Sequence, residues 1–344
     1  MDLRSMYLEE IEKVLSDMGE KAFRAKQIFN WLHKKQVTHI DEMTNISVNL
    51  RERLCAEYSL SQLEIVEKLV SKNDGTIKYL FDLGNNTIIE SVFMKYSYGN
   101  AVCISSQAGC RMGCSFCAST VDGLERNLLA GEMLSQIYEI QRDTGERISN
   151  IVIMGSGEPL DNYDNLIRFL TIINSKEGAE IGHRHITVST CGLVEKIYEL
   201  ADLRLQINLA VSLHAPNDEI RQKTMPVAKK YTMDKLLSAV KYYGDTTKRR
   251  VTYEYALISG VNDSNENASE LAGRLKGTLC HVNLIPVNDV KENNYIRSTE
   301  ETIKRFAGIL QSCGIETTVR RRLGSDINAA CGQLRKRYKK ENNI

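Results

Sequence analysis

The spacing of apolar residues changes twice along the chain. Within residues 5–58 apolar side chains recur every three or four positions, which predicts helices. From residue 75 the spacing shortens to two, with turn residues at Asp74-Gly75 and Gly84-Asn85-Asn86, and this pattern predicts strands. After residue 118 strand-like and helix-like stretches alternate. We therefore expect a small helical region, then a β region, then a longer alternating series.

The alternating series defines the expected architecture. Strands are expected over residues 78–82, 87–94, 101–106, 150–154, 185–189, 207–213, 251–258, 281–285 and 316–320. Helices are expected over residues 130–144, 162–175, 191–201, 233–243, 264–276 and 299–313. Strands that alternate with helices form parallel sheets, so the fold class is α/β and the expected form is a partial (β/α)₆ barrel. The expected regions are a helical domain 1–60, a β extension 61–100, the barrel 101–322 and a C-terminal segment 323–344.

Polar or glycine-rich residues follow several of the expected barrel strands. They are Gly155-Ser156-Gly157-Glu158-Pro159, Ser189-Thr190, Ser212-Leu213-His214 and Pro286-Val287-Asn288. The C-terminal ends of parallel barrel strands meet at one mouth, where reacting groups gather. The pattern favours a ligand shared by these ends, although a single glycine turn would only end a strand.

Composition limits the classes of partner and compartment. With 344 residues the chain has room for two domains of about 150 residues. Its net charge of +1 provides no global field for a polyanion. It has no apolar signal or membrane-spanning run, so we expect no membrane association and a cytoplasmic location. In that reducing compartment, nine cysteines favour metal or redox chemistry over disulfides.

Three of the cysteines are closely spaced. Cys110, Cys114 and Cys117 form a Cx₃Cx₂C motif in a loop that also contains Gly109 and Gly113. Three thiolates in one loop suit a cubane iron–sulfur cluster with one iron left open. A structural zinc site would need a fourth ligand, usually from a second cysteine pair, which the chain lacks. Three packed core thiols are the other alternative.

Several other residues have both a functional and an ordinary explanation. Glu90 interrupts an apolar strand and could be an edge-strand carboxylate, and Cys103 could be a core thiol. Cys331 lies between cations that would favour its thiolate, bind phosphate or end a helix. A basic helix could bind RNA phosphates or simply face solvent; its cations are Lys21, Arg24, Lys26, Lys34 and Lys35.

Taken together, the motifs resemble the RlmN/Cfr family of radical S-adenosylmethionine (SAM) adenosine methyltransferases, and the RlmN branch most closely. The resemblance runs almost end to end. It rests on Phe23–Ile28, Cys103–Cys110, Phe116 before the last cluster cysteine, Gly157–Leu160, His185–Thr190, Ser212–Ala215, Asn283–Pro286 and Ala329–Leu334. One departure is Ser156, where the family often has methionine.

The resemblance implies a radical-SAM barrel with a [4Fe-4S] cluster on Cys110, Cys114 and Cys117, and SAM bound at its open iron. The matched SAM contacts are Gly157, Glu158, Ser189, Ser212, Leu213, His214 and Asn288. The implied substrates are 23S rRNA and tRNA, methylated at C2 of an adenosine. Access to C2 would require the adenosine to leave its stack, and the helical domain and the basic C-terminal helix are the candidate surface for RNA recognition. An external donor of flavodoxin or ferredoxin type would supply electrons, and the protein is expected to be a monomer.

The resemblance also implies a catalytic order. Cys331 would take a methyl group from one SAM, and a radical from a second SAM would activate that methyl to attack C2. Glu90 would accept the C2 proton, and Cys103 would then attack the Cys331 sulfur, forming a transient disulfide and releasing RNA. Cys55, Cys191, Cys280 and Cys313 match no such role and are interpreted as packing thiols.

Three rival functions differ in what they require. A radical SAM enzyme for a small molecule or peptide would keep the cluster but would need neither Cys103 nor Cys331. A non-enzymatic iron–sulfur or zinc protein that binds RNA would not cleave SAM. Cfr-type methylation would place the methyl group at C8 of the same adenosine; the likeness at 283–288 and 320–326 favours C2.

Overall fold

The computed structural model describes residues 1–287, 295–321, 323–327 and 333–342. In this part of the chain a ten-stranded sheet runs in the order β1-β2-β3-β4-β7-β8-β9-β10-β11-β12. The antiparallel strands are β1 (Glu64–Val70), β2 (Ile77–Asp82) and β3 (Ile88–Tyr96), and β3 also pairs antiparallel with β4. The strands parallel to one another are β4 (Gly99–Cys103), β7 (Ile148–Ile153), β8 (Ile186–Thr190), β9 (Asn208–Ser212), β10 (Val251–Leu257), β11 (Cys280–Pro286) and β12 (Glu316–Val319).

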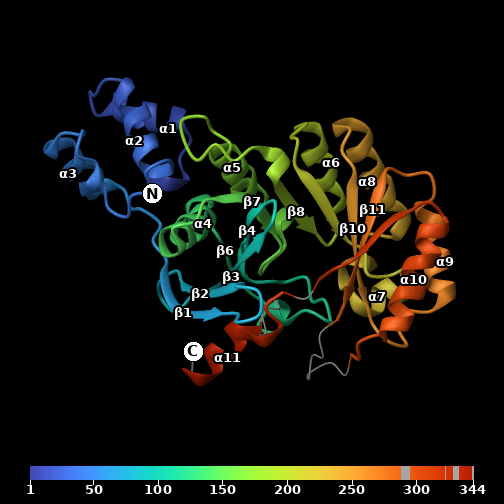
Figure 1. Ribbon diagram of the computed structural model, residues 1–344. Coiled ribbons are helices and arrows are strands. Elements are labelled where there is room, and N and C mark those ends of the chain that lie inside the picture. Colours follow the sequence, from blue (N-terminus) through green and yellow to red (C-terminus); the bar gives the residue numbers. More distant parts are fainter. Residues whose placement is uncertain (288–294, 322, 328–332, 343–344) are drawn as a thin grey trace.

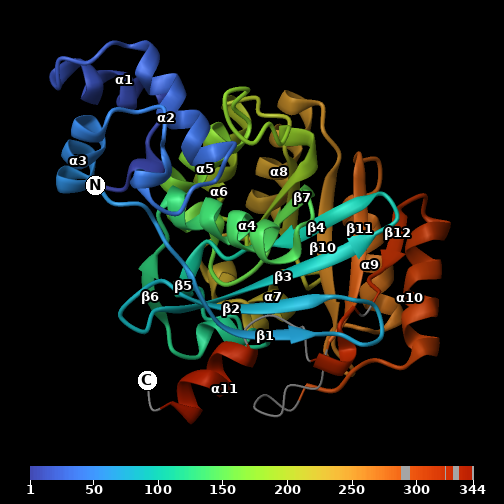
Figure 2. The same ribbon diagram turned by 60° about the vertical axis from the view of Figure 1, so that its left-hand side comes forward.

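Helices connect the successive parallel strands, as expected for the (β/α)₆ series. They are α4 (Ala130–Thr144), α5 (Tyr163–Ile173), α6 (Val194–Asp202), α8 (Met233–Thr247), α9 (Asn265–Leu275) and α10 (Glu300–Ser312). Figures 1 and 2 show these helices around the outside of the parallel strands. Because helices cover the strands, the strands carry apolar runs: Leu209, Ala210 and Val211 of β9 are all buried. The α/β barrel prediction is confirmed.

The N-terminal helices are α1 (Leu8–Asp17), α2 (Phe23–His33) and α3 (Val48–Glu57). Figure 1 shows them grouped beside α4 and α5, away from α9 and α10. The buried Arg4 joins them to the barrel: its guanidinium donates to the Ser135 hydroxyl of α4 at 2.6 Å and to the carbonyl of Val37 at 2.5 Å. A buried charge needs such partners, so this contact fixes the helical region against α4.

The expected strand 101–106 is shorter in the structure. β4 ends at Cys103, and the chain then enters β5 (Gln107–Gly109), which pairs with β6 (Leu124–Asn127) in a separate small sheet. Side chains replace the ladder at the break, where the Ser105 hydroxyl donates to the carbonyl of Glu90 at 2.7 Å and Gln136 accepts from the Ser105 amide at 2.8 Å. Such a side-chain contact across the fold is invisible in the apolar pattern.

A last helix, α11 (Gln333–Glu341), lies beside the antiparallel strands (Figures 1 and 2). Its Leu334 is buried against Leu80 of β2 and Ile88 of β3. None of the helices in the described residues is both long and apolar enough to cross a membrane.

Candidate cluster and cofactor site

The three cysteines of the motif lie in the turn between β5 and β6. Gly109 and Gly113 have φ of 78° and 72°, which glycine adopts without strain. A Cβ on Gly109 would come within 2.1 Å of the Gly123 carbonyl oxygen, so no side chain fits there. The Cys110 amide donates to the same oxygen at 2.9 Å, and this bond closes the base of the loop.

The cysteine thiols form a buried and mutually coupled group. Cys110 and Cys114 are buried, and Cys117 is half-buried. Burial, with a smaller contribution from the charge of Cys117, raises the pKa of Cys110 and of Cys114 to about 12. A raised pKa favours the protonated thiol. A bound metal reverses this, because a thiol that coordinates a metal is deprotonated outright.

The three thiols supply only sulfur ligands. Among the described residues, no three His, Cys, Asp or Glu side chains are placed to hold one metal ion. The donor set of three sulfurs in one loop is the one that a cubane iron–sulfur cluster uses.

A short helix absent from the expected series supports the cluster loop. This helix is α7 (Asp218–Thr224), and the carbonyl of Thr224 at its end accepts from the Ser115 amide at 2.9 Å. Met225, just after it, packs with Cys114 and Cys191. The helix holds a fully buried arginine, Arg221, which the sequence patterns did not identify.

The glycine-rich end of β7 lies beside the cluster loop. Gly157 has φ of 104°, and a Cβ there would approach the Gln107 side chain within 2.6 Å. Glu158 is buried, and its two carboxylate oxygens accept from the amides of Leu160 at 3.0 Å and Cys191 at 2.7 Å. Burial nevertheless raises its pKa. Ser156 is also buried and hydrogen-bonds Ser119, just after the cluster cysteines, through its hydroxyl at 3.1 Å, so serine is accommodated at this position.

The ends of β8 and β9 bring the other predicted SAM contacts to the same mouth. Ser189 lies near the end of β8, and Ser212 ends β9 and is followed by Leu213. His214 is buried with φ of 55°, and its Nδ1 accepts from the Ala256 amide at 2.8 Å. Burial, then the charge of Arg221, lowers the pKa of His214 to about 3, so a neutral ring with its proton on Nε2 remains.

The His214 ring also contacts the cluster loop. It packs edge-on against Phe116, with ring centroids 4.8 Å apart. The structure therefore brings the cysteine motif together with the predicted SAM contacts Gly157, Glu158, Ser189, Ser212, Leu213 and His214. Asn288, the remaining predicted contact, lies outside the described residues.

Glu90 and Cys103 occupy neighbouring strands. Glu90 is on β3 and Cys103 on β4, where Val92 pairs with Cys103 in register. The edge-strand explanation of Glu90 is wrong, because β3 lies between β2 and β4. Glu90 and Lys78 form a buried ion pair of 3.3 Å, with side chains 4% and 0% exposed. Lys78 was not identified as a site residue in the sequence.

The C-terminal helix reaches Glu90. The Arg335 amide donates to the Glu90 carboxylate at 2.6 Å, and the Arg335 guanidinium binds Glu125 at 2.9 Å. Upstream, Asp326 accepts from the Ser71 hydroxyl at 2.7 Å. The chain is thus held on both sides of Cys331, which itself lies outside the described residues.

The packing-thiol interpretation holds for only two of the four remaining cysteines. Cys191 and Cys280 are buried. For Cys55 and Cys313 it is wrong, since both are exposed: Cys55 lies on α3, and Cys313 caps the C-terminus of α10. Cys191 is close enough to Cys114 that their charges interact.

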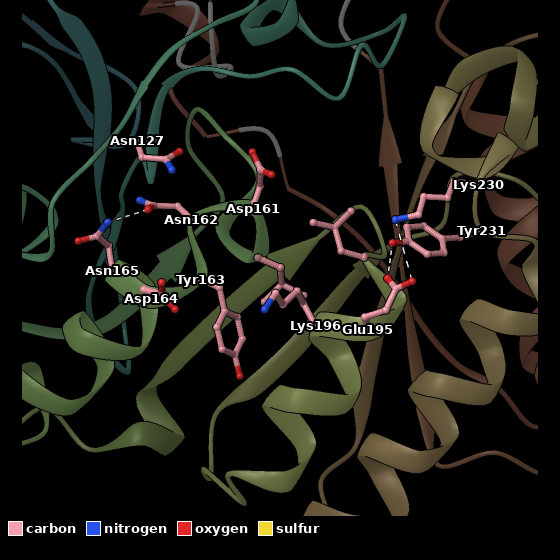
Figure 3. Close-up of a pocket in the computed structure, with 12 residues that line it drawn as sticks. Asn127, Asp161, Asn162, Tyr163, Asp164, Asn165, Glu195, Lys196, Lys230 and Tyr231 are labelled. Carbon is pink, nitrogen blue, oxygen red and sulfur yellow. Dashed lines mark hydrogen bonds and ion pairs between the residues drawn. The ribbon is translucent and has the colours of Figure 1, made fainter.

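Figure 3 shows an open groove of about 470 Å³ whose lining includes Asp161, Asp164 and Lys196. Asp161 in its wall is ion-paired with Arg111 of the cluster loop at 2.5 Å. Its other charged groups have both signs, with Lys196 and Lys230 opposing Asp164 and Glu195. Mixed charge of this kind favours no single class of ligand.

Comparison with known proteins agrees with this geometry. The family model described as "Radical SAM superfamily" matches residues 104–272, and the one described as "Ribosomal RNA large subunit methyltransferase N-terminal domain" matches residues 1–60. The chain is similar to a crystal structure of a radical SAM methyltransferase from Sphaerobacter thermophilus, with a TM-score of 0.92 and 45% identity over 97% of this chain and 98% of that one.

Relatives from two named bacteria extend the likeness over the full length. The chain is 60% identical to the "Probable dual-specificity RNA methyltransferase RlmN" of Alkaliphilus oremlandii, over 98% of both proteins. It is 56% identical to the protein of the same name in Clostridium novyi, over 97% of this chain and 98% of the relative. The resemblance inferred from the motifs is confirmed: the chain belongs to the RlmN family of radical SAM RNA methyltransferases.

Proposed function

We propose that this protein methylates C2 of an adenosine in 23S rRNA and in tRNA. The observation that carries the proposal is the grouping of Glu90, Cys103 and the start of α11 beside a three-cysteine loop, in a chain with full-length RlmN relatives. C2 of adenine lies between two ring nitrogens and is electron-poor, so it resists attack on an ordinary methyl donor. A radical route supplies the reactivity that this carbon needs.

Bound SAM would supply the methyl group and, with an electron from the [4Fe-4S] cluster, a radical able to remove hydrogen. Cys110, Cys114 and Cys117 would hold the cluster. Gly157, Glu158, Ser189, Ser212, Leu213, His214 and Asn288 would hold SAM. An external one-electron donor of flavodoxin or ferredoxin type would reduce the site.

Three residues of the chain would then act on the adenine, each in a different step. Cys331 would carry the methyl carbon on its sulfur. Residue 331 is four positions before Arg335, so their Cα atoms are at most about 14 Å apart, and the Arg335 amide touches Glu90. That tether supports placing the Cys331 sulfur near both the Glu90 carboxylate and the Cys103 thiol.

Glu90 would accept the C2 proton after the carbon–carbon bond forms. Lys78 would hold the Glu90 carboxylate in position, because the two side chains form a buried ion pair of 3.3 Å. The Cys103 thiolate would attack the Cys331 sulfur, forming an S–S bond and breaking the S–C bond. The carbon would keep that electron pair and take a proton to become the methyl group of the released RNA, and an external reductant would restore the two thiols.

The product is the first test of this function. Anaerobic enzyme incubated with SAM, reductant and separately 23S rRNA or tRNA should yield 2-methyladenosine in nucleoside digests measured by mass spectrometry. Synthetic 2- and 8-methyladenosine standards distinguish the two positions. A product dominated by 8-methyladenosine would assign the protein to Cfr-type chemistry instead.

Glu90→Gln should lower the rate of methylation by about 10²–10⁴-fold, the usual contribution of one acid–base group. Iron content and SAM binding should stay as in wild type, because Glu90 is not among the predicted ligands of either. Single-turnover assays with 23S rRNA measure the rate.

The control is Glu125→Gln. Glu125 also binds Arg335, at 2.9 Å, so this change loosens α11 without removing the proposed proton acceptor. Glu125→Gln should lower the rate of methylation much less than Glu90→Gln does. Equal losses in the two variants would mean that Glu90 only docks the helix.

A further inference from the structure

The side chain of Arg221 is a buried cation with an incomplete set of partners. It is fully buried on α7. Its Nη2 donates to the carbonyl of Cys191 at 2.6 Å, and its Nε donates to the carbonyl of Leu213 at 3.3 Å. Its Nη1 is buried, and no described residue accepts a hydrogen bond from it.

No described carboxylate pairs directly with this charge, although the charge of Asp218 on the same helix partly opposes the lowering of the Arg221 pKa that burial causes. In the part of the chain that the structure describes, no Asp or Glu oxygen lies within 4.0 Å of the Arg221 guanidinium. Taking a charge out of water costs several kcal/mol unless an opposite charge or a full set of hydrogen bonds compensates. Arg4 differs in which nitrogen is left over, since both of its terminal nitrogens have acceptors and its Nε has none among the described residues.

The position of Arg221 indicates where the missing anion lies. The carbonyls that it binds belong to Cys191, Leu213 and, at 3.4 Å, Ser212, the last two of which are predicted SAM contacts. Its helix is bonded to the cluster loop through Ser115 and Thr224. Arg221 is also close enough to Cys114 for its charge to oppose the pKa increase that burial causes there.

We propose that Arg221 is the positive counter-charge of the iron–sulfur cluster, a positioning residue that stabilises its reduced state. This inference rests on the proposed cluster at Cys110, Cys114 and Cys117. A cubane held by three thiolates carries net negative charge, and each added electron increases it. Net charge and hydrogen bonds around the sulfurs set the potential of such clusters, so a buried cation beside Cys114 favours reduction.

The test compares two variants at the same position. Arg221→Gln removes the charge and keeps a hydrogen-bond donor for the Cys191 carbonyl, whereas Arg221→Lys keeps the charge and loses the planar fork. The anaerobically reconstituted proteins are titrated without RNA, and the reduced cluster is followed by its electron paramagnetic resonance signal. Iron content and SAM affinity are measured in parallel.

Arg221→Gln should lower the ratio of reduced to oxidised cluster about tenfold at a fixed applied potential, equivalent to about 59 mV for one electron. Arg221→Lys should stay near wild type. An unchanged potential in Arg221→Gln overturns the proposal, and weaker SAM binding with that unchanged potential assigns the guanidinium to the SAM carboxylate. Loss of iron from both variants overturns it in favour of a purely structural role.

These outcomes are separable from those that bear on the proposed function. A wild-type protein that takes up no iron would refute the cluster itself. Wild-type protein with a cluster and 2-methyladenosine activity, but with a potential insensitive to Arg221→Gln, would refute only the role of Arg221.

Discussion

The Cys103→Ala enzyme, incubated with SAM, reductant and RNA, should accumulate a covalent protein–RNA conjugate and release almost no product. Cys103 is the proposed resolving thiol, and it is needed only after the new carbon–carbon bond has formed. Without it, the thioether between Cys331 and the adenine carbon has no thiolate to cleave it. Denaturing gels should show a slow band that ribonuclease collapses and that thiol reductants leave intact, because a thioether is not a disulfide.

Two matched variants serve as controls for this experiment. Cys331→Ala cannot accept the first methyl group, so it should give neither product nor conjugate. Cys280→Ala removes another buried strand cysteine, at the start of β11, and should turn over like wild type. Normal turnover of Cys103→Ala without a conjugate would return Cys103 to the role of a core thiol, packed with Val92, Met94 and Ala101.

The barrel was predictable because its signals are local. Each βα unit shows a change of period within about 30 residues, and β9 with its buried Leu209–Val211 run is an example. Elements fixed by contacts distant in sequence were missed. β1 alternates weakly and is half exposed, and β5 is only the three residues Gln107–Gly109, paired with β6 across the cluster loop.

The candidate site shows the same contrast between features with a local sequence signal and features fixed by distant contacts. Motif spacing placed the three cysteines and the strand ends together, because parallel strands of one sheet share a mouth. Lys78 and Arg221 were missed because a lysine in a strand or an arginine in a short polar helix ordinarily faces solvent. Their signal is burial, which arises from contacts distant in sequence: Lys78 pairs with Glu90 of β3, and Arg221 donates to the carbonyl of Cys191.

The proximity of Cys191 to Cys114 defines an alternative ligand set for the iron, in which Cys191 is a fourth thiolate. Four thiolates, with Cys191 as the fourth, would close the site in the manner of a cluster without an open iron. Cys191 is buried with Cys114 and Met225 in one apolar group. Its amide donates to the Glu158 carboxylate at 2.7 Å, and its thiol is hydrogen-bonded to the same carboxylate.

Replacing Cys110, Cys114 and Cys117 together with alanine should abolish both iron binding and the cleavage of SAM to 5′-deoxyadenosine. Cys191→Ala should keep about four irons per chain and keep SAM cleavage, because a cubane with one open iron takes only three protein thiolates. Anaerobic reconstitution followed by iron analysis and chromatography of 5′-deoxyadenosine measures both. If Cys191→Ala lost its iron while still folding, Cys191 would be a fourth ligand, no iron would be open to SAM, and the proposed methylation chemistry would have to be abandoned. If the triple variant still produced 5′-deoxyadenosine, the three cysteines would not be the ligands at all.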